Sequence, residues 1–194
     1  MPNPLPTPAD ARARLMTIIR ARSFQSGGSY KLASGRVSDL YFNMKPTMLD
    51  PEAAYLTASL MIDALADEPT DFVGGLEMGA VPLVTAIAAV SYLRGEPRRA
   101  LFVRKAAKEH GTQSLIEGLP RGETVARKHV VVIEDVTTTG GSSLKAVAVL
   151  RQAGASVRTV LTLLDREEGA EPAFAVAGVR LLSLLKASDF RAVA

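Results

Sequence analysis

Short apolar runs alternate with longer segments of helical character over most of this chain. The runs at 72–76, 100–104, 130–135 and 157–165 have the length of strands, and 179–185 adds an edge strand. Segments 81–93, which is mostly apolar, and 143–153 lie between them and are expected to be helices. Strands that alternate with helices at this spacing predict an α/β fold, in which a central parallel sheet is flanked by helices.

Two further helices are expected before this alternation begins. The first spans 11–22 after Asp10, which can act as its N-cap, and Gly27 and Gly28 end that segment. The second runs over about 51–66, with a capping aspartate before it and a proline at its first position, where a missing N–H costs nothing.

The 194 residues fit a single domain, 1–194, which is long enough to bury its own core. Its core is expected over about 70–168. Residues 1–50, whose part from 30 to 48 mixes aromatic, hydroxyl and basic side chains typical of short antiparallel strands, should form a small hood with the chain end. The polar, glycine-punctuated stretch 105–122 lacks a helical period, and we expect it to be a mobile loop beside the site.

The stretch 130–142 carries the strongest chemical signal. It reads VVVIEDVTTTGGS: an apolar strand, two carboxylates, and a loop of hydroxyls and glycines before a helix. Glu134 and Asp135 fall at the carboxyl end of the strand, where parallel sheets bind ligands. Backbone N–H groups and a helix N-terminus bind anions, so the pattern predicts a phosphate in the loop and a polyol or metal-bound sugar on the carboxylates. The Gly-Lys-Ser/Thr of a Walker loop and the Gly-x-Gly-x-x-Gly dinucleotide spacing are both absent.

Charge is informative by its placement. Lys and Arg total 23 against 20 Asp and Glu, a net charge of +3 that does not by itself indicate nucleic acid. Residues 94–110 hold six Lys or Arg against two Glu, with few aromatic side chains between them. Because single-strand binders add stacking rings to their charge, a compact polyphosphate is the expected anion and no nucleic-acid partner is expected.

The composition also bears on compartment. Cysteine is absent, which excludes disulfides, thiolate metal sites and cysteine nucleophiles. The start has no basic segment followed by an apolar run, and no stretch approaches the roughly 18 apolar residues of a membrane helix. We therefore expect a cytoplasmic protein with no membrane contact.

The 130–142 stretch resembles the ribose-phosphate signature of the type I phosphoribosyltransferases, which use 5-phosphoribosyl 1-diphosphate (PRPP). Residues 104–112, 165–169 and 32–43 resemble the mobile-loop, base-binding and N-terminal motifs of the orotate phosphoribosyltransferase family, in the same order. The resemblance implies the type I phosphoribosyltransferase fold. It also implies a glycosyltransferase (pentosyltransferase) that moves the 5-phosphoribosyl group from PRPP to orotate, giving orotidine 5'-phosphate and diphosphate, in pyrimidine (UMP) biosynthesis.

The resemblance also implies roles for individual residues. Lys105, Glu134 and Asp135 are the implied catalytic residues. The implied PRPP contacts are Arg104, Lys105, Lys108, His110, Glu134, Asp135, Val136, Thr137, Thr138, Thr139, Gly140, Gly141 and Ser142. The implied orotate contacts are Thr138, Arg166, Tyr41 and Phe42, although Tyr41 and Phe42, taken singly, are equally typical of core residues.

Mg²⁺ is the implied cofactor, brought by PRPP and held directly by no residue of the chain, and a homodimer is the implied functional unit. In that dimer Lys108 and His110 reach the neighbouring subunit's site. Two departures from the family pattern affect the cations: Ala33 stands where many members have lysine, and 77–80 lacks a lysine. Either Lys45 supplies the missing positive charge or diphosphate is bound more weakly.

Two other functions remain open at this stage. A purine-base phosphoribosyltransferase would use the same PRPP loop, but Arg166 and the Lys-Glu-His-Gly loop favour orotate. A non-catalytic PRPP-sensing regulator would be expected to carry a nucleic-acid-binding addition, and no helix-turn-helix segment is evident.

Overall fold

A computed structural model describes residues 7–31, 37–106 and 114–191. At its centre lies a five-stranded parallel sheet of order β4-β3-β7-β8-β9. Its strands are β3 (Phe72–Gly74), β4 (Arg99–Ala100), β7 (Val130–Thr137), β8 (Thr159–Asp165) and β9 (Arg180–Lys186). The predicted α/β fold with a central parallel sheet is confirmed.

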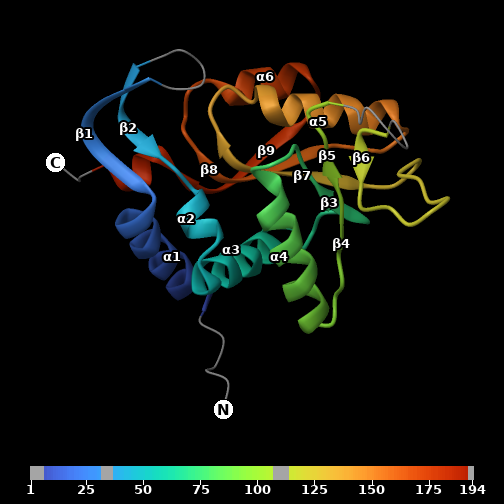
Figure 1. Cartoon of the computed structure of the whole chain (residues 1–194), viewed down its shortest axis with the longest axis horizontal. Coiled ribbons are helices and arrows are strands. Elements are labelled where there is room, and N and C mark those ends of the chain that lie inside the picture. Colours follow the sequence, from blue (N-terminus) through green and yellow to red (C-terminus); the bar gives the residue numbers. More distant parts are fainter. Residues whose placement is uncertain (1–6, 32–36, 107–113, 192–194) are drawn as a thin grey trace.

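Helices cover both faces of this sheet (Figure 1). One face packs on α1 (Pro8–Arg22), α3 (Pro51–Ala64) and α4 (Ala80–Leu93), and the other on α5 (Gly141–Gln152) and α6 (Ala170–Val176). Strand β7 shows why its run is apolar throughout: Val131 and Ile133 enter the first core, whereas Val130 and Val132 enter the second.

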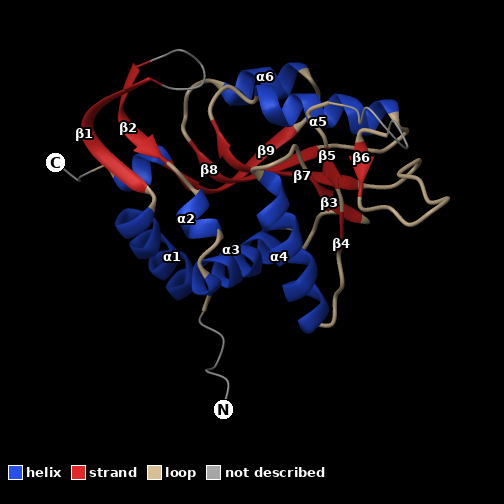
Figure 2. Cartoon of the chain, viewed as in Figure 1, coloured by secondary structure: helices blue, strands red, loops and turns tan. Residues whose placement is uncertain are grey.

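An antiparallel hairpin stands apart from the central sheet (Figure 2). It consists of β1 (Phe24–Lys31) and β2 (Val37–Phe42), and it leads into the short helix α2 (Lys45–Met48). The 3₁₀ helix η1 (Ala187–Phe190) follows β9 and returns to this hairpin, where the rings of Phe24, Phe42 and Phe190 pack with centroids 5.1 to 5.5 Å apart. We use the name hood for the hairpin with α1, α2 and η1.

The first helix differs from its prediction at both ends. Thr7, not Asp10, is its N-cap, because the Thr7 hydroxyl accepts the Asp10 backbone N–H at 3.2 Å and the helix begins at Pro8. Its C-cap is Ser23, and Gly27 and Gly28 lie inside β1 rather than ending the helix. The predicted N-cap of α3 is confirmed, since the Asp50 carboxylate accepts the Ala53 N–H at 3.0 Å.

The strand predicted over 100–104 is divided in the structure. Arg99 and Ala100 form the sheet edge β4, whereas β5 (Phe102–Val103) pairs antiparallel with β6 (Ile116–Glu117). This small ribbon, together with α2 and α6, was not predicted, because such short elements lack a hydrophobic period. β5 lies just before the predicted loop 105–122, and β6 lies inside it. Over the ranges that the structure describes, no helix is both long and apolar enough to cross a membrane.

Candidate active site

The phosphate loop leads directly from β7 into α5. The strand continues to Thr137, two residues past the end predicted at 135, so the two carboxylates lie within its last four residues. Gly140 turns the chain with φ of 81°, a left-handed conformation that favours glycine, and a Cβ there would come within 2.8 Å of the Phe174 ring. Beside the loop lies a cavity of about 330 Å³ lined by Glu134, Val136, residues 137–142 and Lys145.

The two carboxylates point to opposite faces of β7, as successive strand residues do. Glu134 faces α5 and is 6% exposed, and the Ser143 hydroxyl donates to its Oε2 at 2.7 Å. Asp135 faces the start of α4 and is half-buried. A Cβ at Gly79 would lie 2.5 Å from Asp135 Oδ1, so glycine allows this helix to begin beside the carboxylate.

Glu134 and Asp135 therefore differ in environment. Burial raises the pKa of Glu134 to about 8; the Ser143 hydrogen bond lowers that pKa and the neighbouring Asp135 raises it. A carboxyl with such a pKa keeps its proton at neutral pH. Because Glu134 is buried and protonated, it is poorly suited to hold a cation directly in the substrate-free structure.

A basic cavity of about 610 Å³ adjoins the phosphate loop. Its positive charge comes from Arg104, Lys105 and Lys145. Its apolar part is formed by Leu76, Leu115, Ala148 and Val149, and Ser142 also lines it. The Lys105 backbone N–H donates to Glu77 Oε1 at 2.8 Å, and the Arg104 N–H donates to the Leu115 carbonyl at 2.8 Å. These contacts fix the start of the loop at the rim of the site.

Lys145 was missed by the sequence analysis. It lines both the 330 Å³ and the 610 Å³ cavities, as does Ser142, so it stands between the phosphate loop and the Arg104–Lys105 pair. The signal available in the sequence was a lysine four residues after Gly141, one helical turn beyond the loop.

Arg166 links the end of β8 to the hood. Its Nε donates to Glu168 Oε1 at 2.8 Å, and its Nη2 donates to Ser38 Oγ and to the Leu40 carbonyl, both at 3.0 Å. The guanidinium also lies 5.7 Å from the centre of the Phe42 ring. The same residues border a cavity of about 360 Å³ between the 166–168 segment, β2 and η1. Glu168 and Ser38 were not predicted as site residues.

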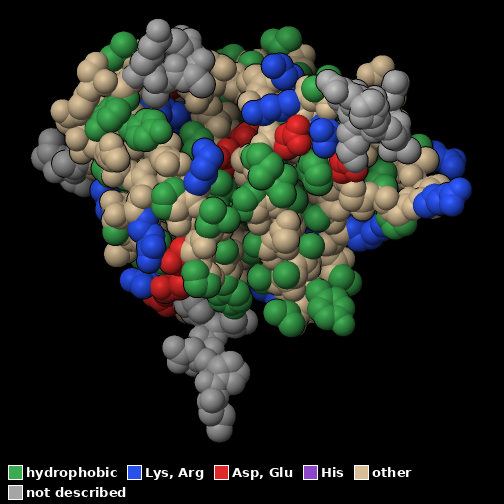
Figure 3. Space-filling model, viewed as in Figure 1, with side chains coloured by type: hydrophobic (Ala, Val, Ile, Leu, Met, Phe, Trp, Pro, Cys, Tyr) green, Lys and Arg blue, Asp and Glu red, His purple; other side chains and the backbone are tan. Residues whose placement is uncertain are grey.

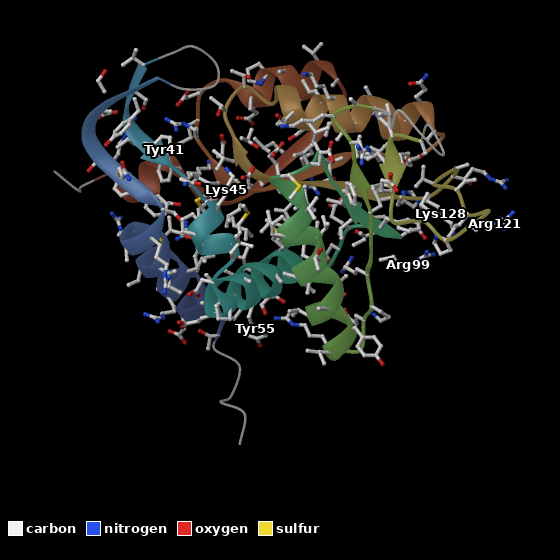
Figure 4. The ribbon with its side chains drawn as sticks, viewed as in Figure 1. Tyr41, Lys45, Tyr55, Arg99, Arg121 and Lys128 are labelled. Carbon is white, nitrogen blue, oxygen red and sulfur yellow. The ribbon has the colours of Figure 1, made fainter. Side chains whose placement is uncertain are left out.

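The two predicted aromatic contacts separate onto opposite faces of β2. Phe42 is 7% exposed within the core beneath Arg166. Tyr41 is half-buried and stacks on Tyr30 with ring centroids 5.3 Å apart, and Figure 4 shows Tyr41 at the hairpin. Orotate binding by either residue stays a prediction.

Several other predicted residues can be placed only in part. Lys108 and His110 lie in 107–113 and Ala33 in 32–36, outside the described residues. Lys45 is exposed at the start of α2, and Figure 4 shows it between the hairpin and the central sheet. Figure 3 shows acidic and basic side chains gathered on the upper part of the visible face, above the largely hydrophobic surface of α4.

Known proteins share this arrangement. A model of the phosphoribosyl transferase domain matches residues 50–183. An orotate phosphoribosyltransferase of Bradyrhizobium diazoefficiens is 60% identical over 180 residues, which are 93% of this chain and 96% of that protein. The chain belongs to the orotate phosphoribosyltransferase family.

Solved structures of the family agree with the fold. The orotate phosphoribosyltransferase of Mycobacterium tuberculosis H37Rv in complex with Fe(III) dicitrate superposes with a TM-score of 0.79 at 39% identity, covering 92% of this chain and 98% of that one. The same enzyme in complex with PRPP superposes with a TM-score of 0.75 at 32% identity, covering 94% and 92%.

Proposed function

We propose that this enzyme transfers the 5-phosphoribosyl group from PRPP to orotate, yielding orotidine 5'-phosphate and diphosphate for UMP synthesis. The observation that carries the proposal is the cavity in which the acidic pair, the 137–142 loop and Lys145 meet. The 60% identity to a curated orotate phosphoribosyltransferase supports the choice of base. A cytoplasmic location stays a prediction.

Each part of the site meets one demand of the reaction. The bond between the anomeric carbon and diphosphate breaks, diphosphate keeps its electron pair, and a ring nitrogen of orotate supplies the pair for the new bond as it gives up its proton. Positive charge develops on the ribose, where Asp135 and the ionised form of Glu134 offset it. Negative charge develops on diphosphate, which Arg104, Lys105 and Lys145 offset from the adjoining cavity.

Mg²⁺ fits this site as an ion carried by the substrate. Within the described ranges, no group of three or more His, Cys, Asp or Glu is placed to hold a metal. The half-buried Asp135 would be the residue to offer such an ion a carboxylate oxygen, whereas Glu134 is engaged with Ser143. When bound, Mg²⁺ would neutralise phosphate charge through oxygen ligands, mostly those of PRPP and water.

A homodimer with shared sites extends the proposal. The ribbon β5–β6 pairs Val103 with Ile116, and the Arg104 N–H donates to the Leu115 carbonyl, so the predicted loop leaves the ribbon beside Lys105 at the rim of the basic cavity. Lys108 and His110 lie in that segment and are proposed to act in the neighbouring subunit's site. Closure of such a loop excludes water and protects the reactive ribosyl centre.

Diphosphate release tests the reaction directly. PRPP, orotate and Mg²⁺ together should release diphosphate and form orotidine 5'-phosphate, and omission of any one component should abolish release. Adenine, hypoxanthine or uracil in place of orotate should give little turnover. Preferred use of a purine would establish the alternative base class, and tight PRPP binding without turnover on any base would identify a regulator.

Arg166→Lys should raise the KM for orotate about tenfold or more and leave the KM for PRPP nearly unchanged. Lysine keeps the charge but loses the planar fork that can meet a carboxylate with two parallel hydrogen bonds. Steady-state kinetics with each substrate varied measures both constants. Arg20→Lys is the matched control, because Arg20 also donates to hood carbonyls, those of Asp189 and Phe190. Equal changes in the two KM values would remove Arg166 from the base site.

Lys145→Ala should raise the KM for PRPP roughly tenfold, with a much smaller effect on orotate. The ammonium group lines both cavities in which the phosphates are proposed to lie, so its loss weakens binding of a polyanion. Lys128→Ala is the control. Lys128 lines neither cavity, and its Nζ lies 3.8 Å from Asp71 Oδ1. An unchanged PRPP KM at low salt would show that Lys145 is a solvent-exposed lysine without a binding role.

A further inference from the structure

The protein holds the guanidinium of Arg166 from two sides. Its Nε donates to Glu168 Oε1 at 2.8 Å, and its Nη2 donates to Ser38 Oγ and to the Leu40 carbonyl. Within the described ranges Nη1 has no hydrogen-bond partner, so its two N–H groups are the donors left for a ligand. A carboxylate that takes both end nitrogens must share Nη2 with Ser38 or Leu40, and these contacts therefore limit the direction of its approach.

The ion pair between Arg166 and Glu168 is largely removed from water. The Arg166 side chain is 5% exposed and the Glu168 side chain 18%. Glu168 Oε2 is buried, and among the described residues it has no hydrogen-bond partner. A buried ion pair repays the cost of leaving water only when its remaining lone pairs are also satisfied. The geometry of this pair therefore supports a role in holding the guanidinium rather than in stabilising the fold.

The backbone between the two partners of this ion pair is strained. Glu167 has φ of 59°, in the left-handed region that residues other than glycine rarely adopt. Its N–H donates to Asp165 Oδ1 at 2.9 Å, and its carboxylate accepts the Ser188 N–H of η1 at 2.9 Å. Strained residues cluster at sites where the surrounding structure needs a fixed geometry. The strain at Glu167 is a second indication that the 166–168 segment is built to place its side chains.

Arg166 lies where the core and the hood meet. Its backbone N–H donates at 2.9 Å to the carbonyl of Thr137, which lines the phosphate cavity. On the hood side its guanidinium bonds Ser38 Oγ and lies 5.7 Å from the centre of the Phe42 ring, and these two side chains share one face of β2. The cavity of about 360 Å³ borders the same group. A base that enters between hood and core would therefore meet an Arg166 whose orientation is already fixed.

We propose that Glu168 and Ser38 are positioning residues for the base, which hold Arg166 so that Nη1 is presented to the carboxylate of orotate. This inference rests on the proposed function and adds two residues to its base site. Glu168 and Ser38 act through Arg166 and touch no reacting atom. Without them Arg166 keeps its charge but its guanidinium can rotate, so orotate binds more weakly while PRPP binding is unaffected.

The KM values of the two substrates measure this effect. Glu168→Gln should raise the KM for orotate about tenfold, because hydrogen bonds between charged groups are the stronger ones. Ser38→Ala should raise it roughly threefold, as expected for one uncharged acceptor, and Ser38→Thr, which keeps the hydroxyl, should restore the wild-type value. The KM for PRPP should stay near the wild-type value in all three variants. Equal rises in the two KM values would indicate general damage to the site and overturn the inference.

A double-mutant cycle shows whether Glu168 acts through Arg166. If it does, the variant that combines Glu168→Gln with Arg166→Lys should have nearly the same KM for orotate as Arg166→Lys alone, because the guanidinium that Glu168 holds is already absent. Two independent effects would instead multiply to roughly a hundredfold rise. That outcome would give Glu168 a role of its own and overturn the assignment of a positioning role.

Two control variants separate positioning from a structural effect. Glu52→Gln breaks an exposed Arg–Glu pair, with Arg14 at 2.7 Å, and should change neither KM. Ser23→Ala removes a buried hydroxyl at the end of α1 that bonds the Thr47 hydroxyl, and should lower Tm without changing either KM.

An orotate KM that is unchanged in both Glu168→Gln and Ser38→Ala would overturn the inference while leaving the proposed function intact. A wild-type protein that uses another base in place of orotate would contradict the proposed function. The same comparison of KM values, made with that base, would then decide the role of Glu168.

Discussion

Lys105→Ala should lower kcat by about 10²- to 10³-fold while PRPP binding changes little, the range found when one preorganised donor to developing charge is lost. Lys105 is exposed at the rim of the basic cavity, and its backbone is fixed by Glu77. A charge that reaches diphosphate only when the loop closes acts mainly in the transition state. Single-turnover kinetics and the PRPP dissociation constant measure the two effects separately.

Arg121→Ala is the matched control for Lys105. Arg121 is an exposed cation of the same connecting segment, but Figure 4 shows it at the far tip of the molecule. Its loss should leave kcat unchanged. A kcat near the wild-type value in Lys105→Ala would remove this residue from the chemical step, and a large loss of PRPP affinity alone would make it a binding residue.

Mixing two inactive variants tests whether the loop is shared between subunits. A variant with Lys108→Ala and His110→Ala lacks the loop cations, and Asp135→Asn lacks one ribose carboxylate. If loops act across the interface, a hybrid dimer holds one site with an intact loop and an intact acidic pair. Random exchange should therefore restore roughly a quarter of wild-type activity. No recovery after demonstrated subunit exchange would show that each loop serves its own subunit.

Replacing the acidic pair should separate activity from stability. Asp135→Asn and Glu134→Gln should each lower kcat/KM by about 10²-fold, because an amide cannot offset positive charge on the ribose.

Glu134→Gln should also be more stable than the wild-type protein in alkaline solution. In the folded protein Glu134 keeps its proton up to a pKa of about 8, whereas in the unfolded chain it loses the proton near the ordinary glutamate pKa of 4.5. The free energy of unfolding of the wild-type protein therefore falls as pH rises through this window, and glutamine has no such loss.

Thermal denaturation of both proteins at pH 5 and pH 8.5 checks the sign. The variant should have nearly the wild-type Tm at pH 5 and a higher Tm at pH 8.5. Glu123→Gln is the control, since Glu123 is a half-buried partner of Arg99, and this ion pair lowers the pKa of the Glu123 carboxyl. It should bring no alkaline gain in stability. A Glu134→Gln variant whose Tm differs from that of the wild-type protein by the same amount at both pH values, and which is fully active, would contradict both the raised pKa and the ribose-site role.

The sequence by itself determined the fold class and the phosphate loop. Both depend on residues close together in the chain: 130–133, the first four residues of β7, are all apolar because alternate residues enter two cores, and the acidic pair and the loop follow directly. Patterns of this kind can be recognised within one short segment of the sequence. Local signals misled where two explanations competed, as at Asp10, whose place as N-cap is taken by Thr7 because Pro8 already suits the first helical turn.

Only the tertiary structure decided which groups share an environment. Arg166 bonds Ser38, a residue 128 positions away. Lys145 also lines a second cavity, whose other walls come from the distant residues Leu76, Arg104, Lys105 and Leu115. The protonation of Glu134 is decided in the same way, because it depends on burial and on the hydroxyl of Ser143 from the facing helix. Desolvation and hydrogen bonding depend on how the chain has packed. The sequence therefore identifies the carboxylate, whereas its protonation state follows from the tertiary structure.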